Sequence, residues 1–536
     1  MRLLICAILS TSLLACSHVE PNPGSSQSAS GNAPVEVAEL DIAALQALMA
    51  NDELTSRALT RRYLDRIAAI DDAGPTLNAV IETNPDALDE AVARDAERRA
   101  GRLRGPLHGI PVLLKDNIDA TPMVNSAGSL ALAEHRPRTD APLVRALREA
   151  GAVILGKTNL SEWANFRSTR SSSGWSARGG QTRNPYVLDR SPCGSSSGTG
   201  AAVAASLAAA GVGTETDGSV ICPAAMNGLV GIKPTVGLVG RSGIIPISKS
   251  QDTAGPMARS VADAALLLGV MASASDPADP ATEATAAHRL ADYTSALDPN
   301  ALDGARIGVL RDAMGSNPVL DAAMERAIAA MKAAGATVVD SEIPTAGKWD
   351  DAEYTVLLYE FKDGLNRYLR DSGVAVDSLE ALIAFNTAHA DREMPWFGQE
   401  ILLQAQEKGP LTEPAYLDAA REARRLAGPQ GIDAALEQHD LDALIAPSTG
   451  PAWLVDPVNG DHFGGAGYGA AAVAGYPSVT VPIGDVHGLP VGAVLMGPKW
   501  SEAELIGLAY SLEQATRART SPRFLPTIAP TTTGDN

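Results

Sequence analysis

Two patterns of apolar and polar positions alternate along the chain. Short apolar runs of the kind found in buried strands occur at 77–81, 110–114, 153–155, 212–214, 229–234, 306–310, 337–339, 441–446 and 478–482. Apolar residues at helical spacing occur at 40–49, 55–70, 85–99, 141–150, 321–333 and through most of 350–440. Because strand and helix signals alternate, the pattern predicts an α/β fold with a mixed or mostly parallel sheet.

The middle of the chain, residues 191–225, combines small residues with an alanine-rich run. A Gly/Ser run at 194–198 precedes an Ala-dominated run at 200–210, and a second small-residue turn follows at 214–219. The alanine run predicts a buried helix, and a loop at a helix start offers free backbone N–H groups. Acyl transfer requires a hydroxyl nucleophile, a helper group and N–H donors.

Two other interpretations of this stretch are weaker. Gly/Ser-rich segments are commonly linkers, but a linker is not followed at once by an apolar helix. Residues 194–198 also fit G-x-S-x-G, which would make Ser196 a nucleophile. That motif requires a strand directly before it, and Pro192 makes 191–193 a poor strand.

Lys115 stands at the end of the apolar run 110–114. It could extend its amine to water along an apolar stem, or it could be a buried base with a lowered pKa. The segment by itself favours the first interpretation.

Residues 156–158 follow a strand in a pattern spaced like a phosphate loop. The residues between its glycines are the strand itself, however, which excludes a nucleotide-binding loop.

The charge balance limits the possible partners. The 536 residues carry a formal net charge of −20, and the sequence pI is about 4.8. A strongly acidic protein is not expected to bind nucleic acid. Histidines and cysteines are scattered without the spacing of a zinc site, so no metal or other cofactor is expected.

The N-terminus has the pattern of an export signal. Residues 1–16 carry one Arg before an apolar run that is too short to span a bilayer, and 13–16 read L-L-A-C, which resembles a bacterial lipobox. We therefore expect a lipoprotein signal peptide at 1–15, a disordered Pro/Gly/Ser-rich tether at 16–36 and a folded domain at 37–530. Cys16 would carry the lipid, which predicts a periplasmic protein anchored to the outer membrane.

Two cysteines, Cys193 and Cys222, lie in the body of the chain. Export would permit a disulfide between them, and small buried residues are the commoner fate of cysteine. The sequence leaves both alternatives open.

Seven motifs together resemble the amidase signature family of serine hydrolases. Within that family, residues 159–167 and 174–186 are most similar to bacterial peptide amidases. The family motifs span most of the chain after the tether: L-H-G-I-P-V-L-L-K-D-N (107–117), G-A-V-I-L-G-K-T-N (151–159), T-R-N-P (182–185), C-G-S-S-S-G (193–198), G-T-E-T-D-G-S (213–219), A-G-Y-P-S-V-T-V-P (474–482) and G-L-P-V-G (488–492).

This resemblance implies a single large α/β domain whose central sheet is covered by helices. Its signature core would be about 105–270, and its largely helical, substrate-side region about 350–440. It also implies a Ser–cis-Ser–Lys triad in which Ser219, 24 residues after Ser195, is the nucleophile. Ser195 would follow a cis peptide bond and relay protons to Lys115, the base, while Ser196 would be a supporting hydroxyl. The implied oxyanion donors are the backbone N–H groups of Thr216, Asp217, Gly218 and Ser219.

Three positions depart from the family pattern. Glu215 stands where Asp is usual, and Asp217 and Ser197 replace glycines. The Asp217 carboxylate beside the nucleophile would disfavour acidic substrates.

The resemblance predicts hydrolysis of carboxamides to acid and ammonia, with C-terminal peptide amides as the expected substrates. The alternatives are a broader aryl or fatty amide hydrolase and a catalytically inactive, peptide-binding lipoprotein. An export signal disfavours the glutamine-transferring component of a tRNA amidotransferase.

Overall fold

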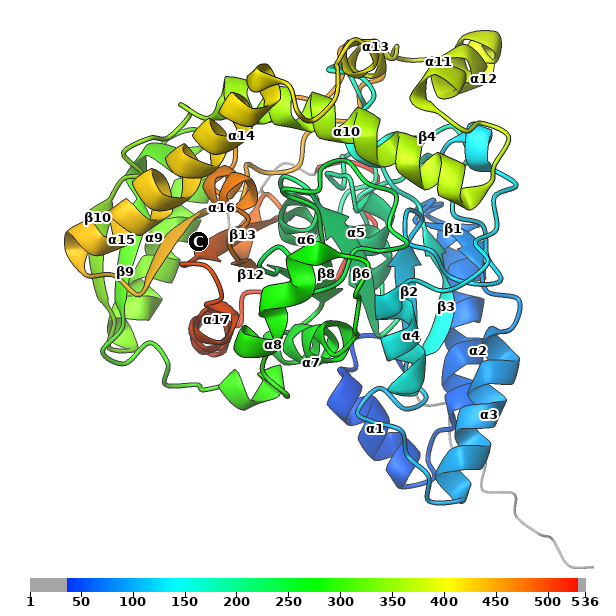
Figure 1. Cartoon of the computed structure of the whole chain (residues 1–536). Helices are drawn as coiled ribbons and strands as arrows, with labels where there is room; N and C mark the ends of the chain where they lie inside the picture. Colours follow the sequence, from blue (N-terminus) through cyan, green and yellow to red (C-terminus); the bar gives the residue numbers. More distant parts are fainter. Residues whose placement is uncertain (1–35, 529–536) are drawn as a thin grey trace, which may run out of the picture. The chain divides into compact units, whose positions relative to one another are not determined.

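The computed structural model describes residues 36–528 (Figure 1). The expected signal peptide, the lipidation residue Cys16 and the expected tether up to residue 35 lie outside the described residues. From Val37 onward the described chain forms one compact unit. Across residues 36–528, no helix combines the length and the apolar character that a membrane span requires.

An 11-stranded mixed sheet forms the centre of the fold, with the strand order β1-β3-β2-β6-β8-β7-β12-β13-β11-β9-β10. Its strands are β1 (Val80–Thr83), β2 (Pro111–Lys115), β3 (Val153–Thr158), β6 (Ala210–Glu215), β7 (Val230–Lys233), β8 (Thr253–Ala258), β9 (Arg306–Leu310), β10 (Thr337–Ser341), β11 (Ala443–Pro447), β12 (Ser478–Val486) and β13 (Leu489–Met496). A separate hairpin pairs β4 (Trp175–Ser176) with β5 (Gly180–Gln181).

Parallel pairing occurs in two blocks of this sheet. One block is β3-β2-β6 and the other is β11-β9-β10, while the strands between them, and the β1 edge, pair antiparallel. The expected mixed sheet is therefore present. Because β2 and β6 are parallel neighbours, their carboxyl ends meet at one edge of the sheet, and these ends carry Lys115 and Glu215.

Each face of the sheet is covered by its own hydrophobic core. Neighbouring residues of one strand belong to different cores: Ile445 packs with α7 and α17, whereas Leu444 packs with α6 and α16. This follows from the alternation of side chains along a strand. The helices that pack around the sheet are α1 (Ile42–Ala50), α2 (Ser56–Arg66), α3 (Ala87–Arg99), α4 (Pro142–Glu149), α5 (Ser197–Ala204), α6 (Ile221–Met226), α7 (Val261–Ala272), α8 (Thr285–His288), α9 (Pro318–Ala333), α16 (Gly469–Ala474) and α17 (Glu502–Thr516).

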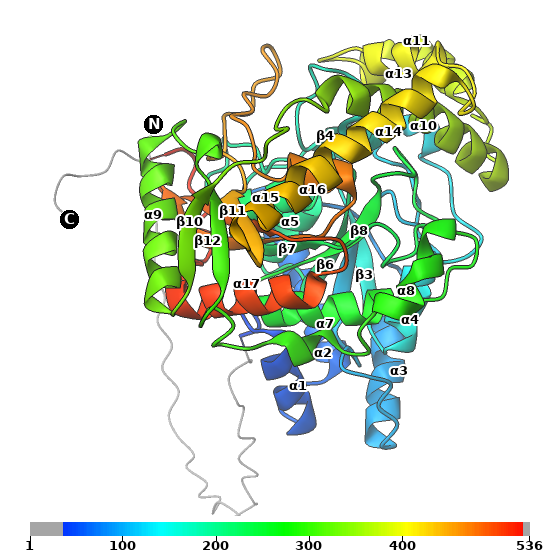
Figure 2. The ribbon, with the colours of Figure 1, turned by 60° about the vertical axis from the view of Figure 1, so that its left-hand side comes forward.

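The region 350–440 is helical, as the sequence predicts. It comprises α10 (Asp350–Ser372), α11 (Leu379–Ala388), α12 (Ala390–Glu393), α13 (Glu400–Gln406), α14 (Pro414–Ala427) and α15 (Ala434–His439). Figure 2 shows α10, α13 and α14 together at the top, above α7 and α17. A hydrophobic cluster that includes Phe361 and Leu365 joins this region to Trp163 and Phe166 of the core.

Three element boundaries differ from the sequence prediction. The alanine run is not one helix: α5 ends at Ala204, Ser206 takes a left-handed φ of 53°, and β6 begins at Ala210. Residues 156–158, which the sequence pattern places after the strand 153–155, extend β3, because they pair with both β1 and β2. The strand expected from residue 77 begins only at Val80, since Asn78 has a left-handed φ of 52°.

Candidate active site

Lys115 is fully buried at the end of β2, with no exposed surface. The expectation that its amine reaches water is therefore wrong. Burial removes water from the charged form, and this lowers the pKa of Lys115 to about 7, although the carboxylates of Glu215 and Asp252 partly oppose the shift. A substantial fraction of the amine is consequently neutral at neutral pH.

The Lys115 amine contacts two residues at hydrogen-bond distance. Its Nζ lies 2.7 Å from Ser195 Oγ, 3.1 Å from the Thr214 carbonyl and 2.9 Å from Thr214 Oγ1. Asn117 Nδ2 also donates to Thr214 Oγ1, at 3.0 Å. Thr214 thus fixes the position of the amine beside Ser195.

Ser195 lies in the loop before α5, after a cis peptide bond from Gly194. The loop is tightly packed: a Cβ at Gly194 would lie 2.2 Å from Ser161 Oγ, so a larger residue would have to displace that hydroxyl. Ser196 is buried, and its hydroxyl accepts from the Thr214 N–H at 3.2 Å and donates to the Thr214 carbonyl at 3.1 Å. These bonds tie the loop before α5 to β6.

Ser219 closes the turn 216–219 just before α6, and 8% of its surface is exposed. Its carbonyl accepts the Ser196 N–H at 3.2 Å, so the two serine segments lie side by side. Gly218 has a φ of +77°, and a Cβ there would overlap the Tyr468 ring at 2.1 Å. The turn therefore depends on glycine at 218 and packs directly against Tyr468.

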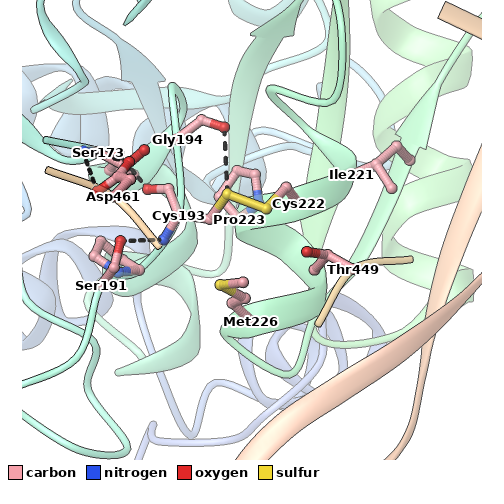
Figure 3. The surroundings of a disulfide bond; sticks show 12 residues. Ser173, Ser191, Cys193, Gly194, Ile221, Cys222, Pro223, Met226, Thr449 and Asp461 are labelled. Carbon is pink, nitrogen blue, oxygen red and sulfur yellow. Dashed lines mark hydrogen bonds between the residues drawn. A yellow bond between two sulfur atoms is a disulfide. The ribbon is translucent and has the colours of Figure 1, made fainter. Parts of the chain in front are cut away.

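A disulfide between Cys193 and Cys222 joins the same two segments (Figure 3). Its S–S distance is 2.01 Å and its Cα–Cα distance is 6.0 Å. The bond settles the alternative that the sequence leaves open. Cys193 stands two residues before Ser195, and Cys222 three residues after Ser219.

Glu215 and Ser197, two departures from the family pattern, have structural partners. The Glu215 carboxylate accepts the backbone N–H groups of Val220 at 2.7 Å and Ile221 at 2.9 Å, which anchors the start of α6. It also interacts with the Gly218 N–H and with the Lys233 charge, while burial raises its pKa. Ser197 Oγ donates to the Cys193 carbonyl at 2.6 Å.

Asp217, the third departure, points to the accessible side of the turn. Its side chain is exposed, yet protein surrounds it. This enclosure, together with the nearby carboxylate of Glu353 on α10, raises the pKa of Asp217 well above its usual range. Burial also raises the pKa of Glu353 to about 7. Two acids with raised pKa values thus border the turn that carries Ser219.

Two further residues hold the turn from outside the family motifs. Gln251 Nε2 donates to the Thr216 carbonyl at 3.3 Å and to Glu353 Oε1 at 2.8 Å. Thr216 Oγ1 donates to Asp252 Oδ1 at 2.6 Å. Sequence reasoning missed Gln251, Asp252, Glu353 and also Tyr468, because they reach the site only through tertiary packing.

In the described part of the chain, there is no group of three or more His, Cys, Asp or Glu side chains that could hold a metal ion.

The fold and this cluster define an enzyme of the α/β class with a buried lysine–serine site. A model of the amidase family matches residues 58–506. The chain therefore belongs to the amidase family and is an amide-hydrolysing enzyme.

Several known proteins are similar over most of their length. The solved structure of native peptide amidase from Stenotrophomonas maltophilia is 60% identical with a TM-score of 0.87, covering 91% of this chain and 99% of that one. The crystal structure of an amidase family protein from Bacillus anthracis is 35% identical with a TM-score of 0.81, covering 91% of this chain and 92% of that one. A probable amidase of Arabidopsis thaliana is 40% identical, over 88% of this chain and 89% of its own.

Proposed function

We propose that the protein hydrolyses the C-terminal amide of peptides to the peptide acid and ammonia, by means of Lys115, Ser195 and Ser219. The observation that carries the mechanism is the 2.7 Å contact between the buried Lys115 amine and Ser195 Oγ. The likeness to a peptide amidase at 60% identity supports the substrate class. Ser195 and Ser219 also belong to segments that are joined by a backbone hydrogen bond and a disulfide.

The base in this mechanism is the neutral amine of Lys115. A neutral amine has two N–H groups and one lone pair. Thr214 offers two acceptors, its carbonyl and its hydroxyl oxygen, at 3.1 and 2.9 Å. When the two N–H groups bind these acceptors, the lone pair is left to receive the Ser195 proton.

The proton chain then activates Ser219. Ser195 gives its proton to Lys115 and takes the Ser219 proton, while Ser219 Oγ bonds to the amide carbon. The negative oxygen is held by backbone N–H groups of Thr216, Asp217, Gly218 and Ser219, with the Gly218 group shared with Glu215. The C–N bond breaks as the proton returns through Ser195 to the leaving nitrogen, which departs as ammonia. Water hydrolyses the acyl-Ser219 ester and restores the hydroxyl.

Variants of the three residues test the mechanism through ammonia release from a peptide amide. Ser219→Ala, Ser195→Ala and Lys115→Ala should each lower kcat by at least about 10³-fold, and double variants should lose little more, because the residues act as a unit. Ser197→Ala is the matched control, since it removes a buried hydroxyl at the start of α5, directly after the loop that carries Ser195. Near-normal turnover by folded Lys115→Ala or Ser219→Ala would contradict the assignment and direct attention to Ser196.

A substrate panel separates this proposal from its alternatives. Peptide amides, free glutamine, aryl amides and long-chain fatty amides are compared by kcat/KM for ammonia release. The proposal expects peptide amides to be the best substrates. A preference for aryl or fatty amides would support the broader hydrolase. Binding of peptide amides without ammonia release would support an inactive binding lipoprotein.

The sequence of the N-terminus supports a second proposal, that the enzyme is exported and anchored by lipid on Cys16. The L-L-A-C pattern at 13–16 and the Pro/Gly/Ser-rich stretch after it carry this proposal. Stable anchoring requires more than one acyl chain. Cys16→Ser should shift the protein from the outer-membrane fraction to the soluble periplasmic fraction and change its mature mass. An unchanged fractionation and mass would exclude lipidation at Cys16.

A further inference from the structure

A large cavity lies beside the candidate active site and is not part of it. Its volume is about 1380 Å³, and it is bounded by α10, α14 and the segment 236–252. Lys115, Ser195 and Ser219 do not line it. Part of its wall is apolar, formed by Val236, Val356, Tyr416, Val473 and Ala474. The cavity can therefore hold an apolar group outside the reaction centre.

Arg424 of α14 and Lys499, which precedes α17, both line this cavity. Both side chains are exposed, and among residues 36–528 neither forms an ion pair. Their charges act on each other: partial burial and the Arg424 charge both lower the pKa of Lys499, while the Glu502 carboxylate partly opposes the shift. Two cations that line one cavity, neither with a carboxylate at ion-pair distance, favour an anionic ligand, in a chain whose net charge is −20.

Most carboxylates around the cavity are already bound to other groups. Glu360 accepts from the hydroxyls of Ser248, Ser250 and Tyr416. The others that are so engaged are Asp119 with Tyr368, Asp252 with Thr216, Asp279 with Arg241 and Asp363 with Arg367.

Asp371 also lines the cavity, near the end of α10. It is 11 residues beyond Glu360, about 16 Å along the helix axis. Tyr416, which binds Glu360, lies on α14 with Arg424. Asp371 is therefore remote from the part of α10 where Glu360 accepts the Tyr416 hydroxyl of α14.

We propose that this cavity is a second binding site for a carboxylic acid, namely the acid that amide hydrolysis releases. Its carboxylate lies between Arg424 and Lys499, and its apolar part packs on Val236, Val473 and Ala474. The proposal rests on the release of an acid by the amidase reaction, not on the choice between peptide and other amides.

The cavity is connected to the candidate oxyanion turn by two side chains. Gln251 and Asp252 line the cavity, and both bind Thr216 of the turn. Gln251 and Asp252 therefore belong both to the cavity wall and to the contacts that hold the turn in place. Occupancy should change turnover, and this change should persist when the amide substrate saturates the active site.

Equilibrium dialysis of the Ser219→Ala protein tests the site directly. The probes are labelled N-acetyl-phenylalanine and its unlabelled amide, which competes for the active site. We expect one acid molecule per chain that saturating amide does not displace. The Arg424→Gln/Lys499→Gln variant should weaken this amide-insensitive binding at least tenfold. Arg425→Gln is the matched control, because Arg425 is the neighbouring exposed cation on α14, pairs with Glu422 and does not line the cavity.

Each result has one consequence. Complete displacement of the acid by the amide, or unchanged binding in the Arg424/Lys499 variant, overturns the proposal. Equal displacement by inorganic phosphate at the same concentration overturns the assignment to a carboxylic acid. Because both substituted side chains are exposed, the variant should unfold at the wild-type temperature, which checks its fold. Failure of the peptide-amide proposal is recognised separately, because the protein would then release no ammonia from peptide amides. The comparison of acid binding between the Arg424→Gln/Lys499→Gln variant and the Arg425→Gln control stays valid in that case.

Discussion

The disulfide between Cys193 and Cys222 ties the loop that carries Ser195 to the helix that follows Ser219. The two serines come from segments separated by a helix and a strand, α5 and β6. A covalent link at this place limits how far the two segments can move apart. It therefore acts on the geometry of the site as well as on the stability of the fold.

We predict that the Cys193→Ser/Cys222→Ser variant loses about 3.6 kcal/mol of unfolding free energy, as expected for a bond that closes a loop of this length. The cysteines are 29 residues apart in the sequence. Urea unfolding with and without reductant measures the effect. Reductant should destabilise the wild type and leave the double variant unchanged. Equal stability of both proteins without reductant would contradict a stabilising role for the disulfide.

The burial of Lys115 predicts a specific pH dependence. Its pKa is lowered to about 7, so the amine is charged below that pH and neutral above it. Only the neutral amine accepts a proton, and kcat/KM for ammonia release should therefore rise with pH and level off above about pH 8. A rise centred near the usual lysine value of 10.5 would show that burial does not tune this base.

Thr214 should control the rate through the amine that it positions. Thr214→Val removes Oγ1, an acceptor for both Lys115 and Asn117. The lost hydrogen bond leaves the amine less well oriented, and we expect kcat to fall about tenfold. Thr214→Ser keeps the hydroxyl and is the matched control, expected to stay within about threefold of wild type. Equal rates for the Val and Ser variants would exclude this positioning role.

The periodicity of the sequence predicts much of the sheet but not its ends. Strands such as 306–310 are predicted at their observed positions because a continuous apolar run marks them. The alanine run at 200–210 carries no such boundary, since alanine favours a helix throughout it. The break at Ser206 is set by backbone conformation and packing, which composition does not reveal.

For the site, the resemblance predicts more than the residues alone do. Lys115 by itself suggests an amine that reaches water, and its burial is visible only once β2 lies inside the sheet. The residues around the Ser219 turn illustrate the remaining limit. Gln251 and Glu353 are polar residues in stretches without a motif, and their hydrogen bond brings α10 against the turn. Long-range packing of this kind leaves no local signal in the sequence.

Gly218 gives the sharpest test of the turn itself. A Cβ at this position would lie 2.1 Å from the buried Tyr468 ring, and the φ of +77° disfavours any side chain. Gly218→Ala must therefore displace the turn that carries Ser219 and the candidate oxyanion donors. Because loss of such donors costs about 10²–10³ in kcat, we expect a fall of at least 10²-fold in ammonia release.

The control is Gly488→Ala, in the turn between β12 and β13. Gly488 has a similar φ of +82°, and no described atom outside its chain neighbours would lie within 4 Å of a Cβ added there. Both substitutions carry the same backbone penalty, but only the one at 218 meets a neighbour. The Gly488 variant should keep its kcat while losing about 1 kcal/mol of stability. If both variants lose activity equally, backbone strain accounts for the loss; if neither does, the turn at 218 tolerates displacement and the proposed oxyanion site is wrong.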